Sequence, residues 1–286
     1  MKMLVVIVAL VYPLLGAGLT ASSAEELKFG VAAMISPQET IKYYRQTIDY
    51  VGKKLGRPVE MVQKHSYDET DKLLEKGELK VAFVCSGPYV VDKEKFGAEL
   101  LVAPQSYGEP FYYAYIIAHK NSGVTDLSQL KGKSFAFTDP KSNTGRLVPA
   151  YMIGKRFNTT PEKFFGRIIY TKTHDKAIEA VAKKIVDGAS VDSLIYNYAA
   201  SKDPRFTSQT RIIAKSPRYG IPPIVTRKDL DPTLKARLRD IFLNMHKDPE
   251  GRAILAGIKV DRFIVPKDSD YDSVREMEKW LRMNIK

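Results

Sequence analysis

The chain has 286 residues, which suits one large domain or two modest ones, each with its own core. Its 44% of hydrophobic and 27% of charged residues are ordinary for a globular protein and exclude a chain that is disordered throughout. The formal net charge of +12 favours an anionic partner, but the basic residues are spread along the chain, so nucleic-acid binding is not expected.

The N-terminus has the features of a secretory signal peptide. Lys2 precedes an apolar stretch at 3–15, and Ser22-Ser23-Ala24 offers small residues for cleavage. No cysteine stands near this position, so a lipid anchor is not expected. The single cysteine, Cys85, excludes an internal disulfide. We expect residues 1–24 to direct export and the rest of the chain to be soluble.

Strand and helix patterns alternate in the first part of the chain. Ser36-Pro37-Gln38-Glu39 reads as a capping box ahead of a helix that ends at Gly56. Strands are predicted at 27–33, 59–63 and 81–85, and helices at 37–55, at 67–76 and from about Pro88. This order predicts a parallel sheet with helices on its faces. Ligands bind such sheets beyond the carboxyl ends of the strands, which is where Ser86 and Tyr89 fall.

A second α/β series follows the loop at 121–123. The predicted elements are a β-rich segment at 111–119, a short helix at 126–130, strands at 134–137, 168–171, 188–191 and 211–214, and helices after Thr144 and from His174 to Val186. Beyond Pro217, a strand at 224–226 precedes helices that begin at Asp231, Asp248 and Ser273. Two such units predict two lobes that close on a ligand. We place lobe 1 at 25–117 plus 217–286 and lobe 2 at 118–216, with crossings near 116–120 and 214–217.

Small polar residues gather where the strand at 134–137 gives way to a helix. The segment reads Asp139-Pro140-Lys141-Ser142-Asn143-Thr144-Gly145. The first backbone N–H groups of a helix have no partner within it, and the helix dipole favours negative charge there. The junction therefore has two interpretations: it binds an oxyanion, or it is an ordinary helix start capped by Ser or Thr.

Two more titratable residues stand at predicted helix starts. His174 is poorly placed to become cationic there and suits a neutral donor to an anion. Asp192 is either a helix cap or a ligand contact. Together with Ser142 they also allow a Ser-His-Asp hydrolase, but no G-x-S-x-G elbow is present. The histidines share no metal-ligand spacing, so no metal is expected.

A series of short motifs supports one family. They are Ser36-Pro37 with Glu39, Leu55 to Glu60, Ala82 to Val90, Leu130 to Lys133, Asp139 to Pro149, His174-Asp175, Val191 to Ser193 and Arg227 to Leu230. In this order and spacing the chain resembles the substrate-binding component of phosphate, phosphite and phosphonate ABC importers. These are type 2 periplasmic binding proteins, α/β proteins of two lobes with hinge crossings between them.

The resemblance implies a set of ligand-binding residues. In the family a Ser-Thr-Ser-Gly stretch binds phosphoryl oxygens, and it falls here on Ser142, Asn143, Thr144 and Gly145. Ser86, Tyr89, His174 and Asp192 match further pocket positions. A tyrosine of the first lobe also contributes, for which we take Tyr44, with Tyr43 as the alternative. Asn143 replaces a hydroxyl residue of the family, and Cys85 leaves a thiophilic oxyanion such as arsenite open.

The resemblance also implies the protein's role. We expect a monomeric, non-enzymatic periplasmic protein without cofactor or metal. It would capture a small phosphorus oxyanion and deliver it to an inner-membrane ABC permease. A periplasmic sensor that reports the anion to a histidine kinase is the alternative, and a hydrolase is the less favoured third class.

Overall fold

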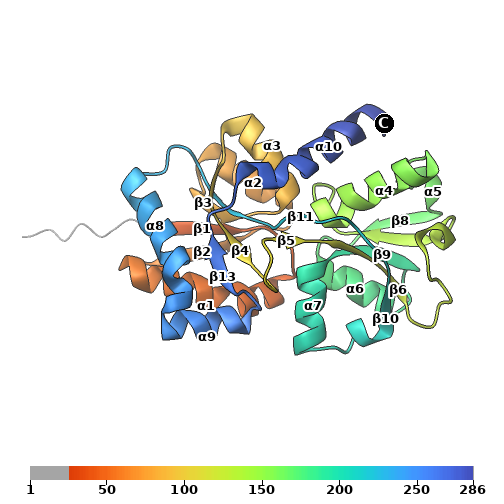
Figure 1. Cartoon of the computed structure of the whole chain (residues 1–286), viewed down its shortest axis with the longest axis horizontal. Coiled ribbons are helices and arrows are strands. Elements are labelled where there is room, and N and C mark those ends of the chain that lie inside the picture. Colours follow the sequence, from red (N-terminus) through yellow and green to blue (C-terminus); the bar gives the residue numbers. More distant parts are fainter. Residues whose placement is uncertain (1–25, 286) are drawn as a thin grey trace, which may run out of the picture.

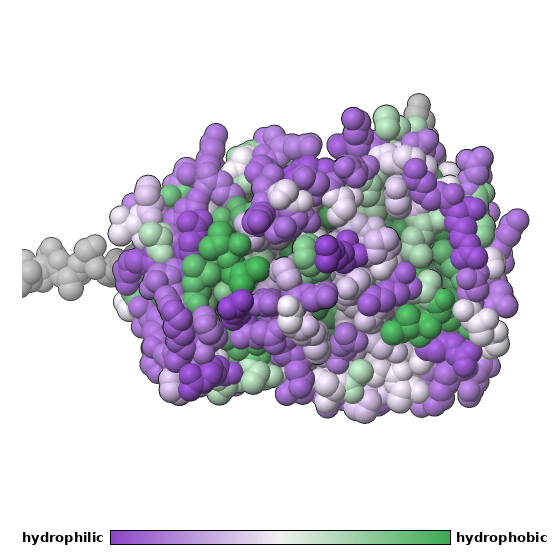
Figure 2. All heavy atoms as spheres, viewed as in Figure 1, coloured by the Kyte–Doolittle hydropathy of each residue, from purple (hydrophilic) through white to green (hydrophobic). Residues whose placement is uncertain are grey.

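The computed structural model describes residues 26–285, so the predicted signal peptide lies outside the described residues. The chain forms two lobes, each built on its own sheet with helices packed against it (Figure 1). This bears out the predicted two-lobed α/β class. Figure 2 shows hydrophilic side chains over both lobes, with smaller apolar patches scattered among these side chains. None of the helices within 26–285 has the length and apolar character needed to cross a membrane.

Lobe 1 is built on a six-stranded sheet in the order β13-β4-β12-β3-β1-β2. Its strands are β1 (Leu27–Val31), β2 (Val59–Gln63), β3 (Val81–Phe83), β4 (Glu99–Gln105), β12 (Ile224–Thr226) and β13 (Arg262–Ile264). Its helices are α1 (Pro37–Leu55), α2 (Tyr67–Lys76), α3 (Ser86–Phe96), α8 (Pro232–Asn244) and α9 (Pro249–Gly257), with the 3₁₀ turns η4 (Met245–Lys247) and η5 (Asp268–Tyr271). β1, β2 and β3 are parallel, so α2 and α3 begin at the same edge of the sheet.

Lobe 2 carries a five-stranded sheet in the order β10-β6-β9-β7-β8. Its strands are β6 (Ala114–His119), β7 (Ser134–Phe137), β8 (Arg167–Tyr170), β9 (Gly188–Asp192) and β10 (Thr210–Lys215). Its helices are α4 (Val148–Phe157), α5 (Pro161–Phe164), α6 (His174–Ala182) and α7 (Ser193–Lys202), with short turns η1 (Leu127–Leu130), η2 (Asn143–Leu147) and η3 (Thr207–Gln209). Because β7, β8 and β9 are parallel, η2, α6 and α7 all start at the edge that faces lobe 1.

The two lobes are joined by a short antiparallel ribbon. It pairs β5 (Phe111–Tyr112) with β11 (Tyr219–Gly220). The boundary predicted at 117/118 falls inside β6, which pairs along its whole length with β9 and β10 of lobe 2. The crossing therefore precedes Ala114. In the sequence β5 and β6 form one β-rich run, but the two strands belong to different sheets.

The last helix, α10 (Asp272–Asn284), lies across both lobes. In lobe 1 it contacts α3, and in lobe 2 it contacts α4. The Trp280 ring meets Tyr151 edge to face, with centroids 5.1 Å apart. It also packs so closely on Gly154 that a Cβ there would lie 2.6 Å from the ring. Residues beyond 217 were all assigned to lobe 1, whereas this helix is shared.

The lobes are closed on each other. The backbone N–H of His174 donates to the carbonyl of Met34 at 3.0 Å, and that of Ser36 donates to Asp175 Oδ1 at 2.9 Å. The Ser36 side chain makes no capping bond to α1, so the predicted capping box is wrong. Lys141 of lobe 2 pairs with Asp68 and Asp71 of α2, at 2.8 Å each. Closure thus joins the starts of α1, α2 and α6 around one cleft.

Candidate functional site

The polar junction after β7 forms a tight turn that leads into η2. Ser142 caps this turn, because its Oγ accepts the N–H of Gly145 at 3.0 Å and its carbonyl accepts two further N–H groups. A Cβ at Gly145 would lie 1.7 Å from Thr138 Oγ1, so only glycine fits there. The side chains of Ser142, Asn143 and Thr144 are fully buried as a result.

Several buried polar atoms around this turn have no partner within residues 26–285. They are Thr144 Oγ1, Asn143 Oδ1, His174 Nε2 and the Tyr67 hydroxyl. An unpaired buried polar atom costs about 1–3 kcal/mol, so a group of four in one place points to a polar ligand. Ser190 Oγ donates to the Thr144 carbonyl at 2.5 Å, which ties η2 to β9 and brings Thr144 towards Asp192 at the end of that strand.

His174 is neutral and its donor is oriented. It occupies the first turn of α6, where its Nδ1 accepts the backbone N–H of Asp192 at 3.0 Å. The ring proton is therefore on Nε2, the atom without a partner. Burial lowers the pKa of His174 to about 3. The structure therefore places a neutral imidazole N–H donor at the cleft.

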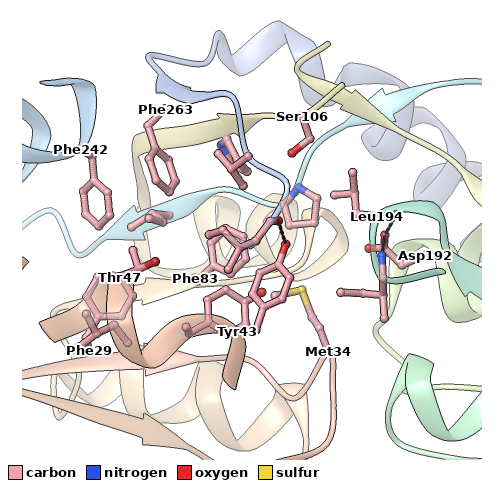
Figure 3. Close-up of a pocket in the computed structure, with 18 residues that line it drawn as sticks. Phe29, Met34, Tyr43, Thr47, Phe83, Ser106, Asp192, Leu194, Phe242 and Phe263 are labelled. Carbon is pink, nitrogen blue, oxygen red and sulfur yellow. Dashed lines mark hydrogen bonds between the residues drawn. The ribbon is translucent and has the colours of Figure 1, made fainter. Parts of the chain in front are cut away.

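Asp192 caps a helix and also lines a pocket. Its Oδ1 caps α7 by accepting the N–H groups of Leu194 at 2.7 Å and Ile195 at 3.3 Å. Its side chain also lines the interlobe pocket of Figure 3. Burial raises the pKa of Asp192 to about 7. The carboxyl group therefore holds a proton readily near neutral pH.

Two tyrosines that the sequence analysis did not select belong to this cluster. The Tyr67 ring is fully buried at the start of α2, and its hydroxyl approaches Ser142. The Tyr112 hydroxyl accepts the Asn143 side-chain N–H at 3.0 Å and lies 3.8 Å from Cys85 Sγ. Tyr67 follows the carboxyl end of β2, a position that the sheet-edge rule could have flagged. Tyr112 lies in the hinge ribbon and had no such signal.

Three residues of the predicted set are not among the unpaired polar groups of the cluster. The Tyr89 hydroxyl donates to Asp268, and its ring packs edge-on against Tyr271, away from the cluster. Ser86 Oγ donates to the Gly220 carbonyl at 2.6 Å. Tyr44 packs between Tyr43 and Phe83, with ring centroids 4.6 and 5.2 Å away. Tyr89 and Ser86 thus make packing or hinge contacts, whereas Tyr44 also lines the apolar pocket next to Asp192.

An apolar pocket adjoins the cluster at Asp192 (Figure 3). Its cavity volume is about 40 Å³, and its walls come from both lobes. Tyr43, Phe83 and Met34 lie on the lobe 1 side, and Leu194 lies beside Asp192 on the lobe 2 side. The Tyr43 hydroxyl is held away from the cluster by the Ile258 carbonyl at 3.0 Å. The site therefore has a polar part and an apolar part that meet at one carboxyl group.

The buried thiol of Cys85 lies behind the polar cluster. Burial raises its pKa to about 11, so the thiol is protonated at neutral pH. Within residues 26–285 no group of His, Cys, Asp and Glu side chains is arranged to hold a metal ion.

Two closed α/β lobes around a buried set of hydrogen-bonding groups define a solute-binding protein of the type 2 periplasmic class. The family model described as "ABC transporter, phosphonate, periplasmic substrate-binding protein" matches residues 29–271. The chain belongs to this family, which confirms the resemblance stated from its motifs.

Similar proteins agree with this assignment. The phosphonates-binding periplasmic protein of Escherichia coli K12 is 26% identical over 275 residues, which cover 93% of this chain and 80% of the relative. A probable ABC transporter phosphite binding protein of Prochlorococcus marinus MIT 9301 is 22% identical, over 64% of this chain and 65% of its own length.

Solved structures show the same fold. A binding protein component of an ABC phosphonate transporter from Pseudomonas aeruginosa matches with a TM-score of 0.84 and 24% identity, covering 90% of this chain and 86% of its own. PhnD1 of Prochlorococcus marinus, solved with methylphosphonate, matches with a TM-score of 0.82 and 18% identity, covering 90% and 98%. The predicted fold class is thereby confirmed.

Proposed function

We propose that this protein captures a small phosphonate, or a closely related phosphorus oxyanion, and delivers it to an ABC permease. The observation that carries the proposal is the set of unpaired buried atoms at Tyr67, Thr144 and His174 beside the carboxyl group of Asp192. The first three can donate hydrogen bonds, and the fourth can accept one. This pattern fits a tetrahedral oxyanion that still carries one proton.

The charge balance separates phosphorus oxyanions from sulfate. A carboxylate repels a fully ionised oxyanion unless the pair shares a proton. A phosphoryl group keeps its second proton up to roughly pH 6 or somewhat higher, whereas sulfate carries none at neutral pH. With the pKa of Asp192 raised to about 7, one proton between the ligand and this group is the favoured state.

Two alternatives draw no support from the site. A Ser-His-Asp hydrolase needs the carboxylate to orient the imidazole, but His174 Nδ1 accepts a backbone N–H and the Asp192 carboxylate caps α7. Capture of arsenite needs a thiolate, and Cys85 is a buried, protonated thiol. A sensor would use the same pocket, so it is separated from a transporter only by its partner.

Calorimetry tests the proposal directly. The exported chain is unfolded, freed of bound anion and refolded, then titrated with methylphosphonate, phosphite, phosphate and sulfate. We expect binding of at least one phosphorus anion with sulfate at least a hundredfold weaker. Equal binding of sulfate would contradict it. Growth of a gene-deletion strain on the bound phosphorus compound as sole phosphorus source then decides between transport and sensing, because only loss of a transporter removes uptake itself.

A further inference from the structure

The apolar pocket of Figure 3 has Asp192 in its lining, the residue that it shares with the polar cluster. We propose that this pocket holds the substituent on phosphorus and selects a hydrogen, methyl or ethyl group over an aminoalkyl group. The inference rests on the proposed function and deepens it, because it concerns what the phosphorus atom carries rather than whether phosphorus is bound.

The pocket walls are apolar almost throughout. Most of its lining side chains are aromatic or aliphatic, among them Tyr44, Phe83 and Leu194, and Asp192 is the one charged residue in the lining. Removing apolar surface from water on both the ligand and the wall favours an alkyl substituent. Each additional buried carbon is expected to strengthen binding about fourfold.

An ammonium group would find neutral hydroxyls at Thr47 and Ser106 but a single carboxylate in this pocket. It has three N–H donors and loses its hydration on entry. Asp192 is the one carboxylate in the lining, and its Oδ1 is already engaged with the N–H groups of α7. Its second oxygen is the acceptor for the phosphoryl proton. An ammonium that took this oxygen would leave the phosphoryl proton without a partner.

The dimensions set an upper limit on the substituent. A single water-sized group needs roughly 10–15 Å³ of cavity volume, and the cavity volume of the pocket is about 40 Å³. Two or three non-hydrogen atoms therefore fit without movement of the walls. A methyl or ethyl group meets this limit, and a longer or branched group would have to displace Tyr44 or Phe83, which are both buried.

The first experiment compares ligands on the wild-type protein. Dissociation constants are measured by calorimetry for phosphite, methylphosphonate, ethylphosphonate and 2-aminoethylphosphonate on refolded, anion-free protein. We expect methyl- and ethylphosphonate to bind at least tenfold more tightly than 2-aminoethylphosphonate. Equal or tighter binding of the amine would overturn the inference and leave the proposed function intact. If no phosphorus anion binds, the proposed function itself fails.

The second experiment introduces a carboxylate into the pocket. Leu194 lines it from the first turn of α7, is only half-buried, and stands where the helix dipole favours negative charge. Leu194→Glu is therefore expected to fold and to tighten 2-aminoethylphosphonate relative to ethylphosphonate at least tenfold. Leu194→Gln has the same length without the charge and should weaken alkyl ligands without favouring the amine. An equal shift in both variants would refute the charge argument, and the wild-type panel decides if Leu194→Glu does not fold.

Discussion

The backbone N–H of Asp192 donates to Nδ1 of His174, with the two nitrogens 3.0 Å apart. This bond fixes which nitrogen of the neutral ring carries the proton, and it holds a donor, Nε2, next to a carboxyl group. A ligand that satisfies both groups must accept one hydrogen bond and share one proton. We therefore propose that the pair distinguishes protonation states of the same anion, which net charge alone does not.

The pH dependence of ligand affinity should be set by the ionisation of Asp192. A complex that holds one shared proton must take it up from solvent once both partners are ionised, so affinity should fall as pH rises above about 7. Asp192→Asn can donate a hydrogen bond as well as accept one, and its affinity should depend less on pH. Calorimetric titrations between about pH 5.5 and 9 with one phosphonate check this. Parallel profiles for the two proteins would mean that Asp192 is only a helix cap.

The Thr144 hydroxyl should serve the ligand rather than the fold. Its Oγ1 has no partner among residues 26–285, so Thr144→Val removes an unpaired buried group and keeps the side-chain shape. Binding should weaken by about 1.5–3 kcal/mol, with unchanged or slightly higher unfolding free energy. Ser142→Ala should weaken binding and also lose about 1 kcal/mol of stability, because Ser142 caps η2. Denaturant unfolding and calorimetry measure both. Loss of stability in Thr144→Val with full affinity would contradict the assignment.

Tyr67 and Tyr89 form a matched pair for testing which tyrosine reaches the ligand. The Tyr67 hydroxyl has no hydrogen-bond partner in the described part of the chain, whereas the Tyr89 hydroxyl donates to Asp268. Tyr67→Phe should weaken binding roughly tenfold with little effect on stability, since it removes a donor to a charged ligand. Tyr89→Phe should lower the thermal midpoint and leave affinity within about twofold. The opposite result would restore Tyr89 to the pocket.

Closure of the lobes should depend on a missing side chain at Gly87. A Cβ there would lie 2.7 Å from the Lys141 carbonyl oxygen across the cleft. Gly87 lies in the first turn of α3, where alanine is a better helix former than glycine, so Gly87→Ala should keep or raise stability while it weakens binding at least tenfold. Small-angle scattering with saturating ligand should show a larger radius of gyration than for wild type. A variant that closes fully would contradict the contact.

The buried carboxyl group of Asp92 should make stability depend on pH. Burial first, and then Asp71 and Glu75, raise its pKa to about 8, against the opposing effect of Lys141 and Lys95. The folded state binds this proton more tightly than the unfolded chain, so stability is lost as pH rises from about 4 through 8.

Asp92→Asn removes this titration. The variant should be more stable than wild type at pH 8, by on the order of 1–2 kcal/mol, and nearly equal to it at pH 4.5. Thermal midpoints by circular dichroism at both values measure the effect, with the exposed Asp49→Asn as control. A difference from wild type that is the same at both pH values would show that the carboxyl group does not titrate on folding.

Much of the fold could be predicted from local patterns. The helix at 37–55 ends where Gly56 adopts a left-handed φ of 67°, and the helix at 67–76 ends likewise at Gly77. β4 and β13 were missed, because Glu99–Gln105 contains a proline and Arg262–Ile264 is only three residues long. The first crossing between the lobes was predicted too late in the chain for a similar reason. Local pattern shows that 111–119 is extended but not which sheet each part joins.

The site was predicted in part for the same reason. The polar turn at Ser142, His174 and Asp192 all stand at or just after strand ends, and chain order alone brings such positions to one edge. Tyr89 lies within a helix, where a one-residue change of phase turns a side chain from cleft to core. Tyr67 reaches the cluster only because closure joins α2 to the 139–141 loop, as in the bond from Tyr67 N–H to Asp139 Oδ2 at 3.2 Å. Sequence spacing carries no information on such a long-range approach.

The ribbon of β5 and β11 limits how the lobes can move. Two separate tethers would let one lobe swing and rotate independently about each of them. Because the two tethers are paired with each other at Tyr112 and Tyr219, we expect them to bend together as one unit. Together with the contacts of α10 to both lobes, this pairing is expected to restrict the directions of opening, so that one distance across the cleft reports how far the lobes have separated.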